Sequence, residues 1–407
     1  MEIIGVIMET NPLHNGHLFL LNQIKKNFNP DIIIAITSTS FTMRGEISVI
    51  NKFDKTRYLL QAGCNLVFEL PTILAVQSGD YFASNAVNIL SKIGVTRIVC
   101  GCEDVNIHNF ESLYEICSQE YFKNTFKQML EKRKSYKQAF TDTLMQLNIN
   151  KKEIELYNSP NFTLAFQYFS YIKKNNLKIE LSLISRNADY YQSATLIRES
   201  IKSKLDTSDY LPFPENIVDL QKAESRLMKI INYKYQILND YYDIEGINKF
   251  IAKNADFYSN FDNFLTSLNN KKYSYSLLRR NIIYNLLDIK ELKKEISYFR
   301  ILGSDTLGFN YLKGLNTEIK KQIFSGYAEK TPTSDVEQIK QFELKATKLY
   351  SIITNDKNLI YNEYQLPIKK GDKNDNWRIK NKTWRYYWSY SRHYPKRKWW
   401  HKTFGLR

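Results

Sequence analysis

Short apolar runs alternate with segments of helical periodicity through the first half of the chain. A continuous apolar run is typical of a strand buried on both faces, whereas apolar residues three and four positions apart are typical of an amphipathic helix. The apolar runs predict strands over residues 3–8, 31–37, 65–69, 97–100 and 178–184. The helical spacing predicts helices over residues 16–28, 50–62, 79–93 and 162–173. This alternation favours βαβ units and a parallel sheet.

The second half of the chain has a different pattern. From about Phe213 onward it is rich in Lys, Asn, Tyr, Ile and Leu at helical spacing, without a clear strand alternation. Residues 368–376 have the composition of a linker. The length of 407 residues fits two or three domains. We expect an α/β domain with a parallel sheet over residues 1–210, a mainly α-helical domain over 211–370 and a basic, Trp-rich tail over 371–407.

The most distinctive segment follows the first predicted strand. Residues 11–17, Asn-Pro-Leu-His-Asn-Gly-His, place two of the five histidines, His14 and His17, at a strand-to-helix turn. Backbone N–H groups and the positive end of the helix dipole point outward at such a turn, so phosphate oxygens bind there readily. Two imidazoles beside that pocket can stabilise the charge that develops when an α-phosphate is attacked. The turn therefore favours nucleotide chemistry.

A metal site and a purely structural role are the alternatives for this histidine pair. Three-residue spacing also suits two metal ligands, but Glu9 is the only acid nearby and the other histidines lie in unrelated segments. The four cysteines show no CxxC spacing, which argues against a zinc site or a disulfide framework. We therefore expect no protein-bound metal.

The net charge of +16 suggests an anionic partner, and it is concentrated at one end. From Trp377 to Arg407 there are ten Lys or Arg and no Asp or Glu, and all five tryptophans fall in this segment. Cations interleaved with aromatic residues can neutralise phosphates and stack on unpaired bases. The tail is thus either an RNA-binding segment or an extension with little function.

No segment has the roughly 18 uninterrupted apolar residues that cross a bilayer, and the sequence opens on a strand without a basic leader. We expect a cytoplasmic protein with no membrane partner.

The histidine turn resembles the HxGH signature of the nucleotidyltransferase superfamily. The whole opening GVIMETNPLHNGHLFLL, residues 5–21, is similar to one family, the bacterial tRNA(Met) cytidine acetate ligases. Later blocks follow in family order: FTMRGE (41–46), AGCNLVFELP (62–71), AVQSGDYFA (75–83), GCE (101–103), SPN (159–161) and SATLIR (193–198). The resemblance covers about residues 1–370 and implies a Rossmann-like nucleotidyltransferase domain followed by a mainly helical domain.

The resemblance also implies the site residues, with His14 and His17 as the catalytic pair. The implied ATP-binding loop consists of Ile7, Met8, Glu9, Thr10, Asn11, Pro12, Leu13, His14, Asn15, Gly16, His17, Leu18, Phe19 and Leu20. The further implied ATP contacts are Gly101, Asn161, Arg186, Asn187, Ser193, Thr195 and Arg198.

Several of these positions carry a more specific expectation. Asn11 could hydrogen-bond the reacting group, and Asn161 could instead be the N-cap of the helix that follows it. Ser193, Thr195 and Arg198 resemble the superfamily's second phosphate-binding motif, which binds β- and γ-phosphates. Thr10 departs from the aromatic residue expected in many relatives.

Two arginines of the second half are candidates for RNA contact. Arg279 and Arg280 lie in an amphipathic stretch that starts near Tyr275, and they are the best phosphate-binding candidates outside the tail. The alternative for each arginine is an ordinary solvated helix face.

The function that the resemblance implies has two steps and uses ATP with Mg²⁺. Acetate attacks the α-phosphorus to give acetyl-adenylate and pyrophosphate, and the exocyclic amine of the wobble cytidine of elongator tRNA(Met) then attacks the activated carbonyl. One alternative is a small-molecule nucleotidyltransferase without RNA, which the basic helical half disfavours. The other is a noncatalytic RNA-binding protein, which the intact turn disfavours.

Overall fold

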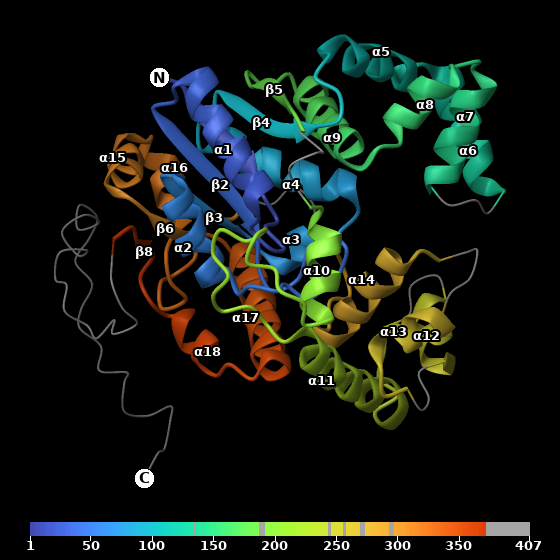
Figure 1. Cartoon of the computed structure of the whole chain (residues 1–407), viewed down its shortest axis with the longest axis vertical. Coiled ribbons are helices and arrows are strands. Elements are labelled where there is room, and N and C mark those ends of the chain that lie inside the picture. Colours follow the sequence, from blue (N-terminus) through green and yellow to red (C-terminus); the bar gives the residue numbers. More distant parts are fainter. Residues whose placement is uncertain are drawn as a thin grey trace. The chain divides into compact units, whose positions relative to one another are not determined.

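The computed structural model describes residues 1–132, 136–186, 192–242, 246–254, 258–268, 273–292 and 297–371. Residues Met1–Lys370 form one compact unit (Figure 1). Residues Gly371–Arg407 form a second unit, and of these only Gly371 is described. The segment from Trp377 to Arg407, for which we expect an RNA-binding tail or an extension with little function, therefore lies outside the described residues.

One sheet organises the first unit. Its strands are β1 (Ile3–Ile7), β2 (Ile32–Ser38), β3 (Leu66–Leu70), β4 (Arg97–Cys102), β5 (Glu180–Ser185), β6 (Phe299–Ser304), β7 (Ile323–Phe324) and β8 (Ile368–Lys369). The order along the sheet is β5-β4-β1-β2-β3-β6-β7, and β8 pairs with β6. Strands β1 to β5 pair in parallel. The five strands predicted from apolar runs are thus confirmed, as is the parallel sheet.

Strand β6 is a difference from the sequence prediction. It pairs antiparallel with β3, with Leu66 opposite Ser304, and all six of its residues are buried. A run this short cannot be told from a buried helix segment by periodicity alone, and it lies in a sequence of helical character. The C-terminal part of the chain therefore completes the sheet that the N-terminal part begins.

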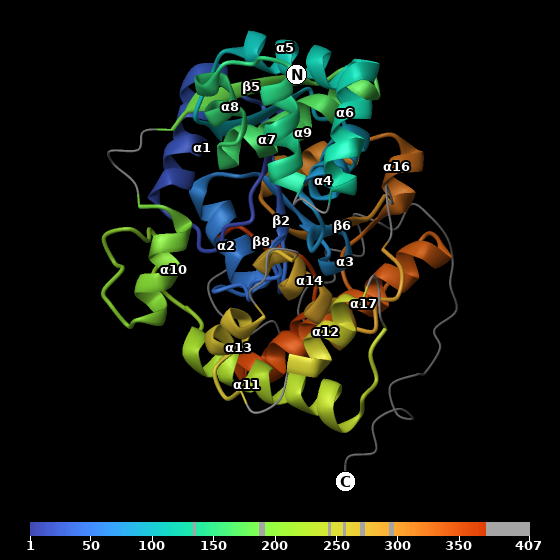
Figure 2. The same cartoon turned by 90° about the vertical axis from the view of Figure 1, so that its right-hand side faces the viewer.

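The helices of the first half connect and cover these strands. They are α1 (Asn15–Phe28), α2 (Lys52–Ala62), α3 (Thr72–Ala75), α4 (Gly79–Lys92), α5 (Ile107–Ser118), α6 (Glu120–Glu131), α7 (Tyr136–Gln146), α8 (Lys151–Tyr157), α9 (Pro160–Lys174) and α10 (Ala194–Lys202). The helices predicted from apolar spacing correspond to α1, α2, α4 and α9 and are confirmed. Helices α5 to α8 follow one another in space and meet α9 through α5 and α8 (Figures 1 and 2).

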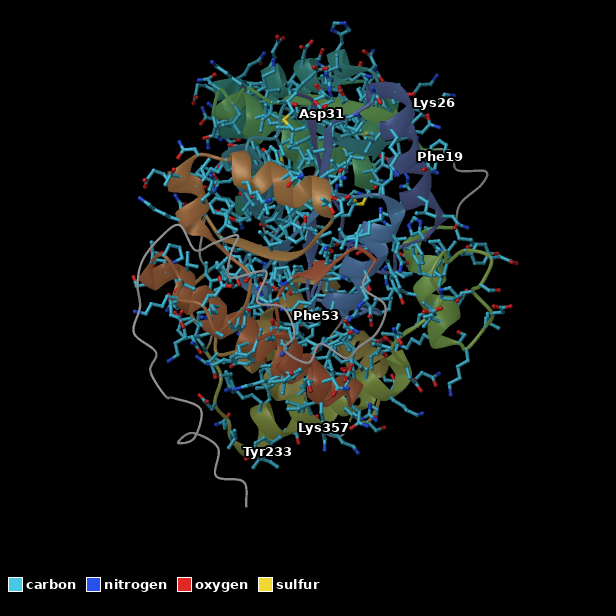
Figure 3. The ribbon with its side chains drawn as sticks, turned by 90° about the vertical axis from the view of Figure 1, so that its left-hand side faces the viewer. Phe19, Lys26, Asp31, Phe53, Tyr233 and Lys357 are labelled. Carbon is cyan, nitrogen blue, oxygen red and sulfur yellow. The ribbon has the colours of Figure 1, made fainter. Side chains whose placement is uncertain are left out.

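The second half is mainly helical, as predicted. Its elements are α11 (Leu220–Asn232), the π-helix η1 (Tyr233–Ile237), α12 (Ile247–Asn254), α13 (Phe261–Ser267), α14 (Tyr275–Leu286), α15 (Thr306–Gly314), α16 (Thr317–Gln322), α17 (Ser334–Thr354) and α18 (Asn358–Asn362). Helices α11 to α14 form a group beside α10 and α17 (Figures 1 and 2). Figure 3 marks the exposed Tyr233 on this group and the buried Phe53 at the start of α2. Among the described residues, no helix is long and apolar enough to span a membrane.

A cluster of buried charges joins the two halves. Lys52 of α2 lies 2.6 Å from Glu69 of β3, 3.1 Å from Glu343 of α17 and 2.6 Å from Glu363, which follows α18. Arg300 of β6 pairs with Glu69 and Glu363. All five side chains are at most 3% exposed. Burial acts to raise the pKa of Glu69, but Arg300 and Lys52 outweigh it and hold that pKa below its ordinary value.

Candidate active site

The turn that follows β1 lies where the strand order reverses. Strand β1 is flanked by β2 on one side and by β4 on the other. In open α/β sheets, ligands bind at such a point, outside the carboxyl ends of the strands. Met8 follows β1, Glu103 follows β4 and Arg186 follows β5, so three loops meet at this edge.

The two histidines cap the helix that they begin. His14 is the N-cap of α1, and its Nδ1 accepts the N–H of Gly16 at 3.0 Å. His17 reaches back, and its Nδ1 accepts the N–H of His14 at 3.1 Å. The arrangement has the reciprocal geometry of a capping box, made here from two imidazoles. The ring centroids are 4.0 Å apart.

Both imidazoles are held neutral. Burial, assisted by the positive charges of Arg186 and Arg198, lowers the pKa of His14 to about 4. Burial also holds the pKa of His17 well below its ordinary value. Because each Nδ1 accepts a backbone N–H, the single proton of each neutral ring is on Nε2. The turn therefore presents two uncharged N–H donors.

The rest of the predicted loop fixes the turn in place. The Asn11 side chain accepts the N–H of Val49 at 2.8 Å and donates to the carbonyl of Ile47 at 3.4 Å. This pairing anchors the loop to residues 47–49. Asn15 donates its backbone N–H to the carbonyl of Tyr210 and its side chain to that of Asp209.

Other residues of the loop are structural neighbours of the turn. Ile7 ends β1, and Met8, Thr10, Pro12 and Leu13 are buried. Leu18, Phe19 and Leu20, on α1, pack against the core.

A second group of predicted residues gathers around Glu103, just beyond β4. Its carboxylate accepts the backbone N–H of Phe162 at 2.8 Å, the side chain of Asn161 and the hydroxyl of Ser159 at 3.3 Å. A guanidinium nitrogen of Arg186 lies 3.6 Å from it. Burial acts to raise the pKa of Glu103, but the Asn161 hydrogen bond and the backbone N–H groups outweigh it and lower that pKa.

The first turn of α9 settles one alternative and places Gly101. Ser159 is the N-cap of α9, so the interpretation of Asn161 as the cap is wrong, because Asn161 lies inside the first turn. A Cβ on Gly101 would lie 3.4 Å from Cγ of Arg186, which puts these two predicted residues side by side. Asn187 lies outside the described residues.

The predicted phosphate-binding motif begins α10. Ser193 is the N-cap, and its hydroxyl accepts the N–H of Leu196 at 3.2 Å. Arg198 donates to the carbonyl of Asn11 at 2.8 Å and to the hydroxyl of Thr195 at 3.3 Å. The second motif is thus tied directly to the loop that carries the histidines.

A hairpin over residues 41–47 lies against the same loop. Phe41 and Ile47 form its bridge, and the backbone N–H of Met43 donates to the Glu9 carboxylate at 2.6 Å. Glu46 pairs with Arg198 at 3.2 Å. Burial raises the pKa of the Glu9 carboxyl.

Lys55 of α2 ties the ends of two strands together. Its amine donates to the carbonyl of Glu9 at 2.9 Å and to that of Ser38 at 3.1 Å. Burial lowers the pKa of Lys55 to about 7.

The two arginines expected to contact RNA have different surroundings. Arg279 lies 3.7 Å from Glu46, and its side chain is 24% exposed. Burial lowers the pKa of Arg280, which interacts with Tyr284 and Asp80. Their role in RNA binding stays a prediction.

Comparisons with known proteins identify the family of the chain. The family model described as HIGH Nucleotidyl Transferase matches residues 1–364. The tRNA(Met) cytidine acetate ligase of Staphylococcus aureus (strain MRSA252) is 31% identical over 384 residues, which cover 89% of this chain and 98% of that protein. The ligase of the same name from Thermosipho melanesiensis is 32% identical and covers 80% of this chain and 84% of its own. The chain belongs to the tRNA(Met) cytidine acetate ligase family of HIGH nucleotidyl transferases.

A solved structure confirms the fold of this family member. The crystal structure of Thermotoga maritima TmcAL bound with alpha-thio ATP matches with a TM-score of 0.80. The two chains are 24% identical, and the match covers 91% of this chain and 100% of the other. At this identity the likeness establishes the α/β fold, as predicted.

Sequence reasoning from the family blocks missed three residues near the site: Glu46, Lys55 and Glu103. Glu46 and Glu103 stand inside blocks that carried the resemblance, but their pairing with distant arginines has no local signal. Lys55 lies on the helix predicted over residues 50–62, where a lysine is ordinarily a surface residue. The sequence signal that could have identified Lys55 is its position among the apolar residues on one face of this helix.

Proposed function

We propose that the chain is an ATP-dependent ligase that activates acetate as acetyl-adenylate and acetylates the exocyclic amine of the wobble cytidine of elongator tRNA(Met). The observation that carries the proposal is the pair of Nε2–H donors on His14 and His17 at the switch point of the sheet, in a member of this family. The substrate assignment rests on relatives named tRNA(Met) cytidine acetate ligase. A tRNA substrate favours a cytoplasmic location.

In the first step, a carboxylate oxygen of acetate bonds to the α-phosphorus while the bond to the bridging oxygen of the β-phosphate breaks. Pyrophosphate leaves with the electron pair. The two imidazole N–H groups donate to the phosphate oxygens, whose charge grows in the transition state. Arg186 and Arg198 contribute positive charge beside them. Catalysis by these residues consists of positioning and electrostatic stabilisation.

In the second step, the cytidine amine attacks the carbonyl carbon of acetyl-adenylate. A C–N bond forms, the C–O bond to the phosphate breaks and AMP leaves with the electron pair, while the amine loses a proton. The target base must leave its stack to reach the site. The basic second half would hold the tRNA by its phosphates, with Arg279 and Arg280 as candidates.

The protein side chains here do not fit a resident Mg²⁺ site. Among the described residues there is no group of three or more His, Cys, Asp or Glu that could hold a metal. The Glu9 carboxylate accepts the Met43 N–H, and Glu46 pairs with arginines. We therefore assign Mg²⁺ to the substrate, as the ion that accompanies the phosphates of ATP.

The test is mass spectrometry of the nucleosides of elongator tRNA(Met) after incubation with the full chain, ATP, Mg²⁺ and isotopically labelled acetate. Two variants remove the imidazoles but keep a capping side chain: His14→Asn and His17→Gln. We expect labelled acetylcytidine from the wild type and a loss of at least about 100-fold in each variant. A lack of label, with ATP consumed alongside another acceptor, would instead identify a small-molecule nucleotidyltransferase.

A matched control separates chemistry from helix capping. Asn150 is the N-cap of α8 and accepts the N–H of Glu153 at 2.9 Å. Asn150→Ala removes a cap from another helix, at a cost of about 1 kcal/mol in stability. We expect it to retain wild-type acetylation at a temperature where all variants are folded.

A further inference from the structure

Glu46 holds two arginines from different helices at one point beside the histidine turn. One carboxylate oxygen lies 3.2 Å from a guanidinium nitrogen of Arg198, on α10, and the other lies 3.7 Å from a guanidinium nitrogen of Arg279, on α14. The side chains of these three residues, which we call the arginine fork, are between 15% and 24% exposed. Two guanidinium groups therefore face one small anionic group.

The backbone fixes the position of this fork. Gly45 adopts φ +74°, and a Cβ on it would lie 2.8 Å from the backbone carbon of Arg279 and 2.8 Å from the backbone nitrogen of Arg280. The hairpin over residues 41–47 thus packs directly on the α14 backbone. Its other side is tied to the turn through Glu9 and Asn11.

The fork is continuous with the predicted phosphate site. Arg198 donates to the carbonyl of Asn11 at 2.8 Å while its other terminal nitrogen contacts Glu46. Arg279 reaches the same carboxylate from the opposite helix. Phosphate groups, like carboxylates, offer neighbouring oxygens that match guanidinium donors.

We propose that Arg279 binds the terminal phosphates of ATP, and the pyrophosphate product, together with Arg198, and that Glu46 is the positioning residue that keeps the two guanidinium groups together. The assignment rests on the proposed function, because it takes ATP as the ligand of this site. It places a residue of the helical half at the nucleotide, where the sequence had suggested an RNA contact or a solvated helix face.

The test is calorimetric measurement of the dissociation constants of ATP, pyrophosphate and AMP with the full chain. We expect Arg279→Gln to weaken ATP and pyrophosphate by about tenfold or more, as for the loss of a hydrogen bond to a charged group. AMP lacks the terminal phosphates, so its binding should change by less than about twofold. Arg279→Lys keeps the positive charge but lacks the planar guanidinium group, so it should recover part of the affinity. If the Gln variant does not fold, the Lys variant gives the same comparison.

A matched control removes the same charge elsewhere in the helical half. Lys345, on α17, is 48% exposed and pairs with Asp288 at 3.4 Å. Lys345→Gln should leave all three dissociation constants within about twofold of wild type, since exposed charges away from the site are screened.

The role of Glu46 is tested by a double-mutant cycle. If Glu46 positions Arg279, the effect of Arg279→Gln on pyrophosphate binding should shrink to a small fraction of its size in a Glu46→Gln background. Additive effects of the two substitutions would show that Glu46 does not position Arg279.

The outcomes separate this inference from the proposed function. A wild-type chain that binds neither ATP nor pyrophosphate contradicts both. A wild type that binds them, with an Arg279→Gln variant that binds them equally well, overturns the inference alone. An Arg279→Gln variant that loses tRNA binding but keeps ATP and pyrophosphate binding also overturns it, in favour of an RNA contact.

Discussion

At the scale of single residues, contacts within the chain itself fix the tautomers of the two histidines, without a ligand. Each ring uses Nδ1 to accept a backbone N–H, from Gly16 in one case and from His14 itself in the other. The same contacts that start α1 therefore select the tautomer that donates through Nε2. Helix capping occupies Nδ1 of each ring and thereby keeps the proton on Nε2, the atom that the proposed chemistry uses.

The buried neutral state of His14 predicts a specific pH dependence of stability. Its pKa is about 4 in the folded chain against an ordinary value of 6.5, so the unfolded chain takes up the proton first as the pH falls. The contribution of neutral His14 to the free energy of unfolding is complete above pH 6.5 and is lost as the pH falls toward 4. At about 1.4 kcal/mol per pKa unit, the full loss is about 3 kcal/mol. Urea unfolding at pH 7.5 and 4.5 measures it.

The matched variant is His14→Asn, which caps the helix but does not titrate. Its loss of unfolding free energy between the two pH values should be smaller than that of the wild type by about 2.5 kcal/mol. Equal losses in the two proteins would contradict the assignment of the effect to His14.

At the scale of elements, the hairpin over residues 41–47 packs against helix α14 through Gly45, which has no side chain to separate it from the α14 backbone. Gly45→Ala adds both a strained φ and a clash with the backbone of Arg279. Gly246 has a nearly equal φ of +76°, but a Cβ there would meet no atom within 4 Å among the residues that the structure describes. The pair thus separates backbone strain from contact.

We expect Gly246→Ala to cost about 1–2 kcal/mol, the penalty for a left-handed backbone with a side chain. Gly45→Ala should cost at least about 1 kcal/mol more, because overpacking adds to the same penalty. It should also weaken ATP binding, which Gly246→Ala should not. Urea unfolding measures the stability of both variants, and calorimetry measures their ATP binding. Equal losses of unfolding free energy would show that the hairpin can shift away from α14 at little cost.

The buried charge cluster gives a second prediction at this scale. Arg300→Met leaves the buried carboxylates of Glu69 and Glu363 with one cation fewer, so we expect a loss of about 3–5 kcal/mol in unfolding free energy. Lys345→Met breaks an exposed pair with Asp288 and should cost less than about 1 kcal/mol. Urea unfolding of the two variants measures the difference, and similar small losses would mean that Lys52 alone compensates the buried carboxylates.

At the scale of the whole molecule, the sequence predicted what depends on neighbouring residues. The histidine turn, the five parallel strands and α1, α2, α4 and α9 all have local signals. The pairing of Glu46 with Arg198 and Arg279 does not, because the partners are more than 150 residues away along the chain. Strand β6 was missed for a similar reason, since its partner β3 decides its structure.

The sheet therefore predicts how fragments behave. A fragment of residues 1–210 ends between α10 and α11, where we predicted a domain boundary, and it leaves the β3 edge unpaired and Glu69 without Arg300. Such an edge invites pairing with other chains. We expect this fragment to aggregate, whereas residues 1–370 should stay soluble and unfold in one transition. Expression followed by size-exclusion chromatography checks both, and a monomeric 1–210 fragment would contradict the prediction.

The distance along the chain between β3 and β6 also determines the delay between the translation of these two strands. Tyr298, just before β6, lies 229 residues after Glu69 of β3. At roughly 5–20 residues per second, a ribosome needs about 10–50 seconds to make that stretch. Strands β4 and β5 are translated within this interval, so before it ends each nascent chain has all five parallel strands but not β6. The β3 edge is then unpaired, and nascent chains on neighbouring ribosomes of one message are the first that could pair with it.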